Sequence, residues 1–148
     1  VGEYGMVLPR FVADALAPRP LSVHGDGAQS RCFCDVRDVA PALVSLCQSS
    51  DCAGKVFNVG SDQPITIMDL AREVIETLGS EAGISLTPYD EAFGPGFEDL
   101  RQRRPDLTRV REAIGFAPSI PLRRTILDVA DHVRRDANRS DPRESPHS

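Results

Sequence analysis

The chain contains 148 residues, 41% of them hydrophobic and 26% charged, and this length favours one domain around one core. Twenty-two acidic residues against 17 basic ones leave a net charge of −5. This balance argues against a general nucleic-acid-binding protein, which would carry a basic face. The apolar runs are too short for a membrane-spanning helix, so we expect no membrane partner.

The N-terminus has neither the basic region nor the apolar core of a secretory signal, which predicts a cytoplasmic protein. Because the first residue is Val1 rather than methionine, we expect the coding region to begin upstream. Disulfides are not the default without a signal, and Cys-x-Cys followed by Cys-x4-Cys is not a usual zinc spacing. Buried or half-buried thiols and no metal are therefore expected at Cys32, Cys34, Cys47 and Cys52.

In chain order, the first elements predicted are a helix and two short strands. Apolar residues recur at helical spacing over Val7–Leu16. Strands are predicted at Leu21–His24 and 31–36, on either side of a Gly-Asp-Gly turn. Since side chains of a strand alternate between its faces, Cys32 and Cys34 should share one face.

A second helix should follow as far as about Cys47, capped by Asp35 or Asp38. Pro41 favours Asp38 as the cap, because a proline is best tolerated in the first helical turn. Residues 55–60 then predict a strand that ends in a glycine turn.

The clearest helix begins at a capping box formed by Thr66 and Asp69, carries one apolar stripe and stops at Gly79. The elements predicted after it are a strand, a loop, two helices and a disordered tail, at Ile84–Thr87, 89–105, Thr108–Ile114, 122–133 and 137–148. The loop is either a lid over a ligand, around its Phe-Gly-Pro-Gly-Phe sequence, or a surface excursion. Residues 1–136 would form the folded part.

This order of elements predicts an α/β or α+β protein with about four short strands, which suggests part of a larger unit. No glycine-rich dinucleotide fingerprint, phosphate loop, Gly-x-Ser-x-Gly elbow or Tyr-x-x-x-Lys pair occurs. We therefore expect no catalytic and no cofactor-binding residue in this chain. Sixteen of the 17 basic residues are arginines. They indicate either phosphate binding, for which guanidinium groups are suited, or GC-rich coding bias.

Several segments carry a family resemblance in their order and spacing. They are 6–11 (MVLPRF), 20–27 (PLSVHGDG), 29–40 (QSRCFCDVRDVA), 56–60 (VFNVG), 103–106 (RRPD) and 114–118 (IGFAP). Together they resemble the C-terminal half of the extended short-chain dehydrogenases/reductases, the NAD-dependent nucleotide-sugar epimerases, dehydratases and decarboxylases.

The resemblance implies the substrate-binding part of a Rossmann-fold enzyme, with strand and helix pieces that return to the Rossmann sheet. The NAD-binding half and the Tyr-x-x-x-Lys pair would precede Val1, so the chain would be a fragment that is inactive alone. The whole enzyme would oxidise a UDP- or dTDP-sugar at C4 with NAD and act as a homodimer. The residues leave open whether it is an epimerase of the UDP-glucose 4-epimerase type, a dehydratase or a decarboxylase, and so an isomerase or a lyase.

The resemblance assigns the diphosphate to Arg31 and Arg103, which would grip it from opposite sides, and the ribose hydroxyls to Asp106. Guanidinium groups suit this role because they bind phosphate oxygens bidentately. Alternatively, Arg31 is a surface residue paired with Asp26 or Asp35. Further arginines lie within two residues of Arg103 on both sides.

The base would lie against main-chain groups near Met6, Val7 and Ser22, with His24 where the family carries a larger aromatic side chain. His24 would stack on a pyrimidine, or it is a polar residue at the rim. Two further departures are Asp35, where histidine or tyrosine is common, and Pro18, in place of glycine. The competing hypothesis is a truncated, non-catalytic protein that binds nucleotides or associates with a subunit.

Overall fold

The computed structural model describes residues 6–89, 91 and 100–139. Its helical elements are α1 (Val7–Leu16), α2 (Val36–Gln48), the 3-10 turn η1 (Ser50–Cys52), α3 (Ile67–Leu78), α5 (Thr108–Ile114) and α6 (Leu122–Arg139). Its strands are β1 (Leu21–His24), β2 (Ser30–Cys32), β3 (Pro64–Thr66) and β4 (Ile84–Thr87). β1 pairs with β4 in parallel, and β2 pairs with β3 antiparallel.

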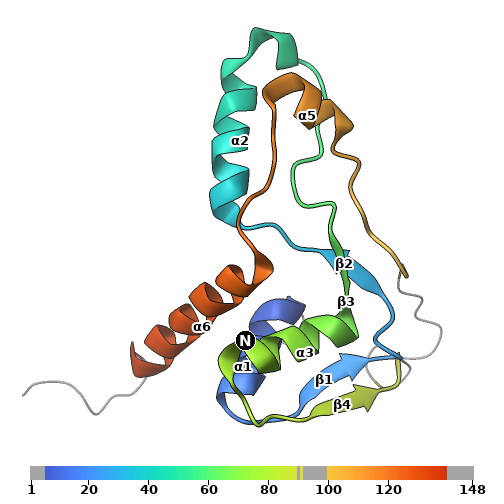
Figure 1. The fold of residues 1–148 in the computed structure, drawn as a ribbon, viewed down its shortest axis with the longest axis vertical. Helices are drawn as coiled ribbons and strands as arrows, with labels where there is room; N and C mark the ends of the chain where they lie inside the picture. Colours follow the sequence, from blue (N-terminus) through green and yellow to red (C-terminus); the bar gives the residue numbers. More distant parts are fainter. Residues whose placement is uncertain (1–5, 90, 92–99, 140–148) are drawn as a thin grey trace, which may run out of the picture.

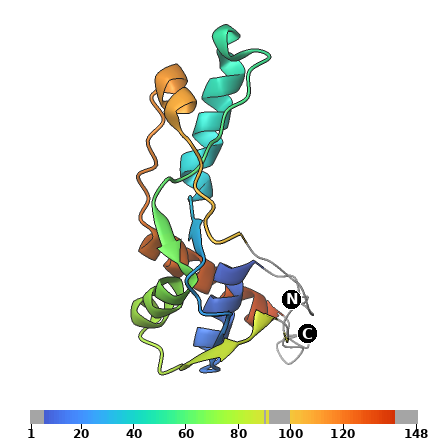
Figure 2. The same ribbon diagram turned by 90° about the vertical axis from the view of Figure 1, so that its right-hand side faces the viewer.

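The described elements form an elongated molecule with two lobes (Figure 1). In the lower lobe, α1, α3 and α6 pack against one another beside the β1–β4 sheet. The upper lobe contains α2 and α5, and the β2–β3 pair lies between the lobes, as the turned view also shows (Figure 2). The lower core includes the buried side chains of Phe11, Leu21, Leu70 and Ile126, and the smaller upper core those of Ala42, Leu107, Val110 and Phe116.

Helix α3 confirms the predicted capping signals. The hydroxyl oxygen of Thr66 accepts a hydrogen bond from the amide of Asp69 at 3.0 Å, and Gly79 adopts the left-handed conformation with φ of 58°. The apolar stripe between these ends faces the lower core, where Leu70, Ala71 and Val74 are fully buried. Cap, stripe and stop thus agree, which is why the sequence predicts this element well.

The predicted cap of α2 was wrong, because Asp35 and not Asp38 occupies that position. Asp35 Oδ1 accepts the amide of Arg37 at 2.9 Å, and Pro41 lies inside the helix. Asp38 Oδ2 instead accepts the amides of Ser119 and Ile120 at 3.1 and 3.0 Å. A proline one turn into the helix removes only one amide from the ladder, whereas both carboxylates gain strong acceptor roles in this register.

The strand predicted at 55–60 does not form. A strand needs a neighbouring chain for its backbone groups, and here the segment is tied by side chains instead. Arg109 Nη1 donates to the carbonyl of Val56 at 3.0 Å, and Asn58 Nδ2 donates to that of Asp106 at 3.2 Å. The strand predicted at 31–36 is also shorter than expected, and its partner β3 was not predicted.

The end of the last helix was also misplaced. α6 continues through Arg139, so the predicted tail begins with three helical residues. The rest of that tail, 140–148, and the Phe-Gly-Pro-Gly-Phe part of the predicted lid lie outside the described residues. No helix in the described part of the chain is long and apolar enough to cross a bilayer.

Candidate functional site

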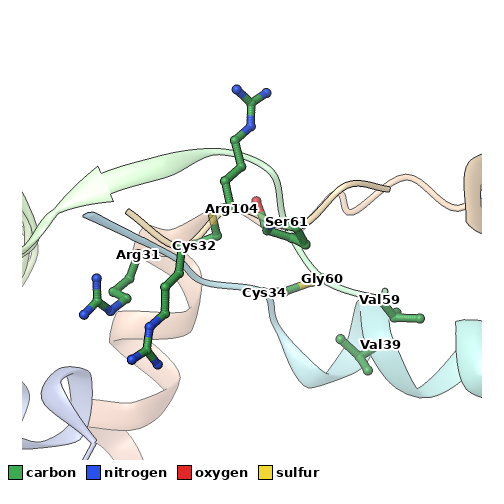
Figure 3. A pocket seen from close by; sticks show the side chains of 10 residues that line it. Arg31, Cys32, Cys34, Val39, Val59, Gly60, Ser61 and Arg104 are labelled. Atoms are coloured by element: carbon green, nitrogen blue, oxygen red, sulfur yellow. The ribbon is translucent and has the colours of Figure 1, made fainter. Parts of the chain in front are cut away.

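A pocket of about 600 Å³ opens where the two lobes meet (Figure 3). Three short segments and one side chain of α2 line it: Arg31, Cys32, Cys34, Val39, Val59, Gly60, Ser61, Arg103, Arg104 and Pro105. The structure therefore places the two arginines singled out in the sequence, Arg31 and Arg103, on the same pocket although 72 positions separate them in number. Arginine side chains give the pocket a positive character that suits an anion.

Backbone pairing explains why these two arginines meet. Ser30 forms a parallel bridge with Gln102, and its amide donates to the carbonyl of Arg101 at 2.8 Å. Arg31 and Arg103 each follow a bridged residue by one position, and side chains alternate along extended chain. The side chains of the two arginines therefore project from neighbouring segments toward the same side. Two guanidinium groups on one pocket can both bind the oxygens of one anion, so this arrangement suits a phosphate ligand.

Arg31 is further anchored to the segment that carries Arg103. Its Nη1 donates to the carbonyl of Leu100 at 2.9 Å and to that of Ser30 at 2.7 Å. The two aspartates considered as alternative partners of Arg31 have other roles in the structure. Asp35 accepts hydrogen bonds from Arg37, and Asp26 Oδ1 accepts the amide of Ala28 at 2.9 Å.

Arg104 lies on the pocket but is directed differently from Arg31 (Figure 3). Its Nη2 is 3.7 Å from Asp62 Oδ2, and Arg111 Nη2 is 3.1 Å from the same oxygen. Burial acts to raise the pKa of Asp62, but the hydrogen bond from Arg111 and the charges of Arg111 and Arg104 hold that pKa below its ordinary value. Arg104 therefore shares an ionised carboxylate with Arg111.

The two thiols expected on one strand face both line this pocket. Cys32 and Cys34 are half-buried, and burial raises the pKa of each thiol. The nearby charge of Arg104 partly opposes this rise at Cys32. Within the described ranges, no group of three or more metal-ligating side chains comes together.

Asp106 does not line the pocket. Its Oδ1 accepts the amide of Thr108 at 2.9 Å, at the beginning of α5, and this hydrogen bond lowers the pKa of the carboxyl group. The carboxylate therefore helps to begin a helix, and the ribose contact assigned to it stays a prediction. Its backbone position, three residues after Arg103, still places it close to the arginine segment along the chain.

The residues predicted to contact the base lie in the lower lobe, away from the pocket lining. Met6 precedes α1 and is 77% exposed, while Val7 packs against the lower core. On β1, the carbonyl of Ser22 accepts a hydrogen bond from Arg10 Nη2 at 3.1 Å. His24 ends the strand, and burial together with the charge of Arg10 lowers its pKa, which favours the neutral imidazole.

Sequence reasoning missed Arg10 and Asp62, which orient other charged or polar groups around the two regions. The guanidinium group of Arg10 lies 5.6 Å from the centre of the Phe11 ring and donates to β1. Arg10 lies in the 6–11 segment and Asp62 lies in no quoted segment, but no motif assigned either a role, because their roles depend on contacts across 12 and 49 positions in the chain. Only the three-dimensional structure could identify them.

The comparisons with known proteins agree with this architecture. A family model described as the NAD dependent epimerase/dehydratase family matches residues 1–60. Over 93% of its length the chain is 30% identical to a UDP-N-acetyl-alpha-D-glucosaminuronate decarboxylase of Bacillus cytotoxicus. The chain belongs to the NAD-dependent epimerase/dehydratase family. A second family relative is UDP-glucuronic acid decarboxylase 2 of Arabidopsis thaliana, 36% identical over 88% of this chain. The chain spans 42% and 28% of the lengths of these relatives.

Solved structures of the family show the same fold. UDP-glucose 4-epimerase of Thermotoga maritima, solved with UDP-glucose, has a TM-score of 0.78 at 23% identity, covering 92% of this chain and 42% of that one. UDP-glucuronic acid 4-epimerase of Bacillus cereus, solved with UDP-glucuronic acid and NAD, has a TM-score of 0.76 at 20% identity, covering 88% and 40%. The likeness confirms the predicted α/β class, and the chain corresponds to about 40% of each of these structures.

Proposed function

We propose that this chain is the nucleotide-sugar-binding portion of an NAD-dependent enzyme that acts on a UDP-sugar or dTDP-sugar through oxidation at C4. The observation that carries the proposal is the meeting of Arg31 and Arg103 on one pocket, through the bridge between Ser30 and Gln102. Paired guanidinium groups can each bind phosphate oxygens bidentately, so together they suit a diphosphate.

The relatives support a finer proposal, a UDP-sugar that carries a carboxylate. The curated relatives described above are decarboxylases named for UDP-glucuronic acid or UDP-N-acetylglucosaminuronate. A decarboxylase requires a substrate with a carboxylate to lose. We therefore favour decarboxylation of a UDP-uronate over epimerisation or dehydration as the reaction of the whole protein.

Within the part of the chain that the structure describes, the glycine turn at 25–27 does not fit an NAD site. A dinucleotide-binding turn connects a strand to a helix whose N-terminus receives the pyrophosphate. The Gly25–Gly27 turn follows β1 but leads into β2, so it offers no such helix terminus. The proposal therefore assigns NAD to residues outside this chain. We assign binding and no chemical step to the residues described.

Titration calorimetry of the full-length protein with UDP, dTDP, UDP-glucuronate and uridine tests the proposal. If the arginines bind the diphosphate, UDP and dTDP should bind at least ten times more tightly than uridine, because one charge-assisted contact contributes about 1.5–3 kcal/mol. Their affinity should fall as salt is added, since the charges of the pocket are then screened. Equal affinity for uridine and UDP, or no binding of UDP, would contradict the proposal.

A non-catalytic protein that binds nucleotides or associates with a subunit is the second candidate. The observation in its favour is the sequence itself, which contains no Tyr-x-x-x-Lys pair and no glycine fingerprint. The coding region upstream of Val1 distinguishes the two candidates. An in-frame fingerprint and Tyr-x-x-x-Lys pair would favour the enzyme, and a stop codon would favour the second candidate.

A further inference from the structure

Two thiols line the pocket and have no role in the proposed function. Cys32 and Cys34 belong to the segment that carries Arg31, and both are half-buried (Figure 3). The other two cysteines lie elsewhere: Cys47 is exposed on α2, and Cys52 is buried in η1. A thiol reagent that enters the pocket therefore meets two of the four cysteines of the chain.

The charges on the same pocket select which reagents can enter. Arg31, Arg103 and Arg104 line it together with the thiols. A cleft lined by one sign of charge concentrates ligands of the opposite sign and repels those of the same sign. Burial raises the pKa of both thiols, and at Cys32 the charge of Arg104 opposes this rise while that of Asp62 adds to it. Thiol chemistry in this pocket should consequently prefer anionic partners.

We propose that Cys32 and Cys34 form a modification site for anionic disulfides, of which oxidised glutathione is the example, and that the adduct closes the pocket to nucleotides. The first part stands on the pocket alone, and the second rests on the proposed function. A cysteine thiolate attacks one sulfur of oxidised glutathione, a mixed disulfide forms, and the glutathione disulfide bond breaks. One glutathione leaves as a thiolate and takes up the proton that the cysteine released, so no further oxidant is required.

The adduct would act through both volume and charge. A glutathionyl group is a tripeptide that must occupy part of a pocket of about 600 Å³. Its carboxylates would lie near the guanidinium groups that we assign to the diphosphate, and so would compete for the same contacts. Because disulfide exchange leaves the protein chain intact, a reducing thiol should reverse the effect.

Labelling with two disulfides of opposite charge tests the site. The protein is treated separately with oxidised glutathione and with cationic cystamine, and the adduct at each cysteine is quantified by peptide mass spectrometry. Cys47, exposed and away from the pocket, is the matched control. We expect the ratio of glutathione to cystamine labelling to be at least about tenfold higher at Cys32 or Cys34 than at Cys47, and to fall in high salt. Equal ratios at all three cysteines would overturn the site.

Calorimetry with UDP on the modified protein tests closure of the pocket. We expect fully glutathionylated protein to lose at least about ninety per cent of its UDP affinity, a tenfold change, and to regain it after reduction with dithiothreitol. Unchanged UDP affinity after complete modification would overturn closure while leaving the proposed function intact. If the unmodified protein does not bind UDP, the proposed function and closure both fail, and the labelling ratios still decide the modification site.

Discussion

Asp35 shows how one acidic side chain joins two helices. It is 6% exposed, caps α2, and accepts hydrogen bonds from Arg37 Nε and Nη2 at 2.8 and 2.7 Å. Thr125 of α6 donates to its second oxygen at 2.8 Å. Arg37 also contacts Asp128 of α6, at 2.6 Å. Asp35 therefore contributes to a structural contact between α2 and α6.

Replacing Asp35 by asparagine should destabilise the fold by about 2 kcal/mol, because a hydrogen bond to a charged group contributes about 1.5–3 kcal/mol. The variant keeps a side chain that can cap a helix, so the loss reports mainly on the charged contacts with Arg37. Urea unfolding at neutral pH measures the difference, with D26N, an exposed aspartate, as the control.

The difference in stability between D35N and the wild type should shrink in acid. Hydrogen bonds from Arg37, against the opposing effect of burial, hold the pKa of Asp35 well below its usual value of 3.8. A depressed pKa in the folded state stabilises the protein above the unfolded pKa, and this contribution is lost as the pH falls toward the folded value. The wild type and D35N should therefore converge in stability below about pH 4. A difference that stays constant from pH 7 to pH 3 would contradict this account.

Among individual residues, the sequence singled out the two pocket arginines and missed Asp62 beside Arg104. Arg31 and Arg103 could be singled out because each sits in a recognisable motif. Asp62 could not, because its role depends on its approach to Arg104 and Arg111 from a separate segment. Long-range ion pairs leave no periodic signal, so they remain invisible until the backbone brings their partners together.

At the scale of elements, the sequence predicted best the helix whose determining residues all lie within or next to the helix itself. α3 has its cap, stripe and stop within 14 residues, and the sequence located all three. The strand predicted at 55–60 has the right composition and still does not form, because a strand depends on partners that the segment lacks. β3 was missed for the opposite reason: its three residues carry little pattern, and pairing with β2 alone defines them.

Two glycines near the end of α3 provide a matched test of this local physics. Gly79 has a φ of 58°, where a side chain costs about 1–2 kcal/mol, and no atom lies near its added Cβ. Gly83 also has open space but no positive φ. Thermal melting should show G79A destabilised by about 1 kcal/mol, and G83A unchanged or slightly more stable. Equal effects of both substitutions would show that the left-handed turn does not limit stability.

At the scale of the whole molecule, the two lobes differ in how well they bury apolar side chains. The lower lobe has the larger core, although Met6 and Leu86 are exposed there, and the upper lobe leaves Val36, Leu43, Val44 and Val56 between 50% and 76% exposed. These side chains lie on α2 and on the segment that was predicted to be a strand. Exposed apolar surface of this kind favours association.

The 148-residue chain expressed by itself should therefore self-associate or have a low melting temperature. Its upper lobe has a small core, and exposed apolar side chains accompany it. Size-exclusion chromatography and a thermal melt measure this directly, and V44E/V56K should reduce association by adding charge to that surface. A sharp, reversible transition of a monomer at ordinary temperature would contradict the expectation.

The central claim concerns the whole arrangement, in which two distant segments place Arg31 and Arg103 on one diphosphate. Calorimetry of UDP binding to R31A, R103A and the double variant of the full-length protein, with R101A as the control from the same segment, tests it most directly. Each single substitution should weaken UDP binding roughly ten- to a hundredfold. The double variant should lose less than the product of the two effects, because both guanidinium groups serve one ligand. Wild-type affinity in both single variants, or a loss in R101A as large as theirs, would contradict the assignment of this pocket.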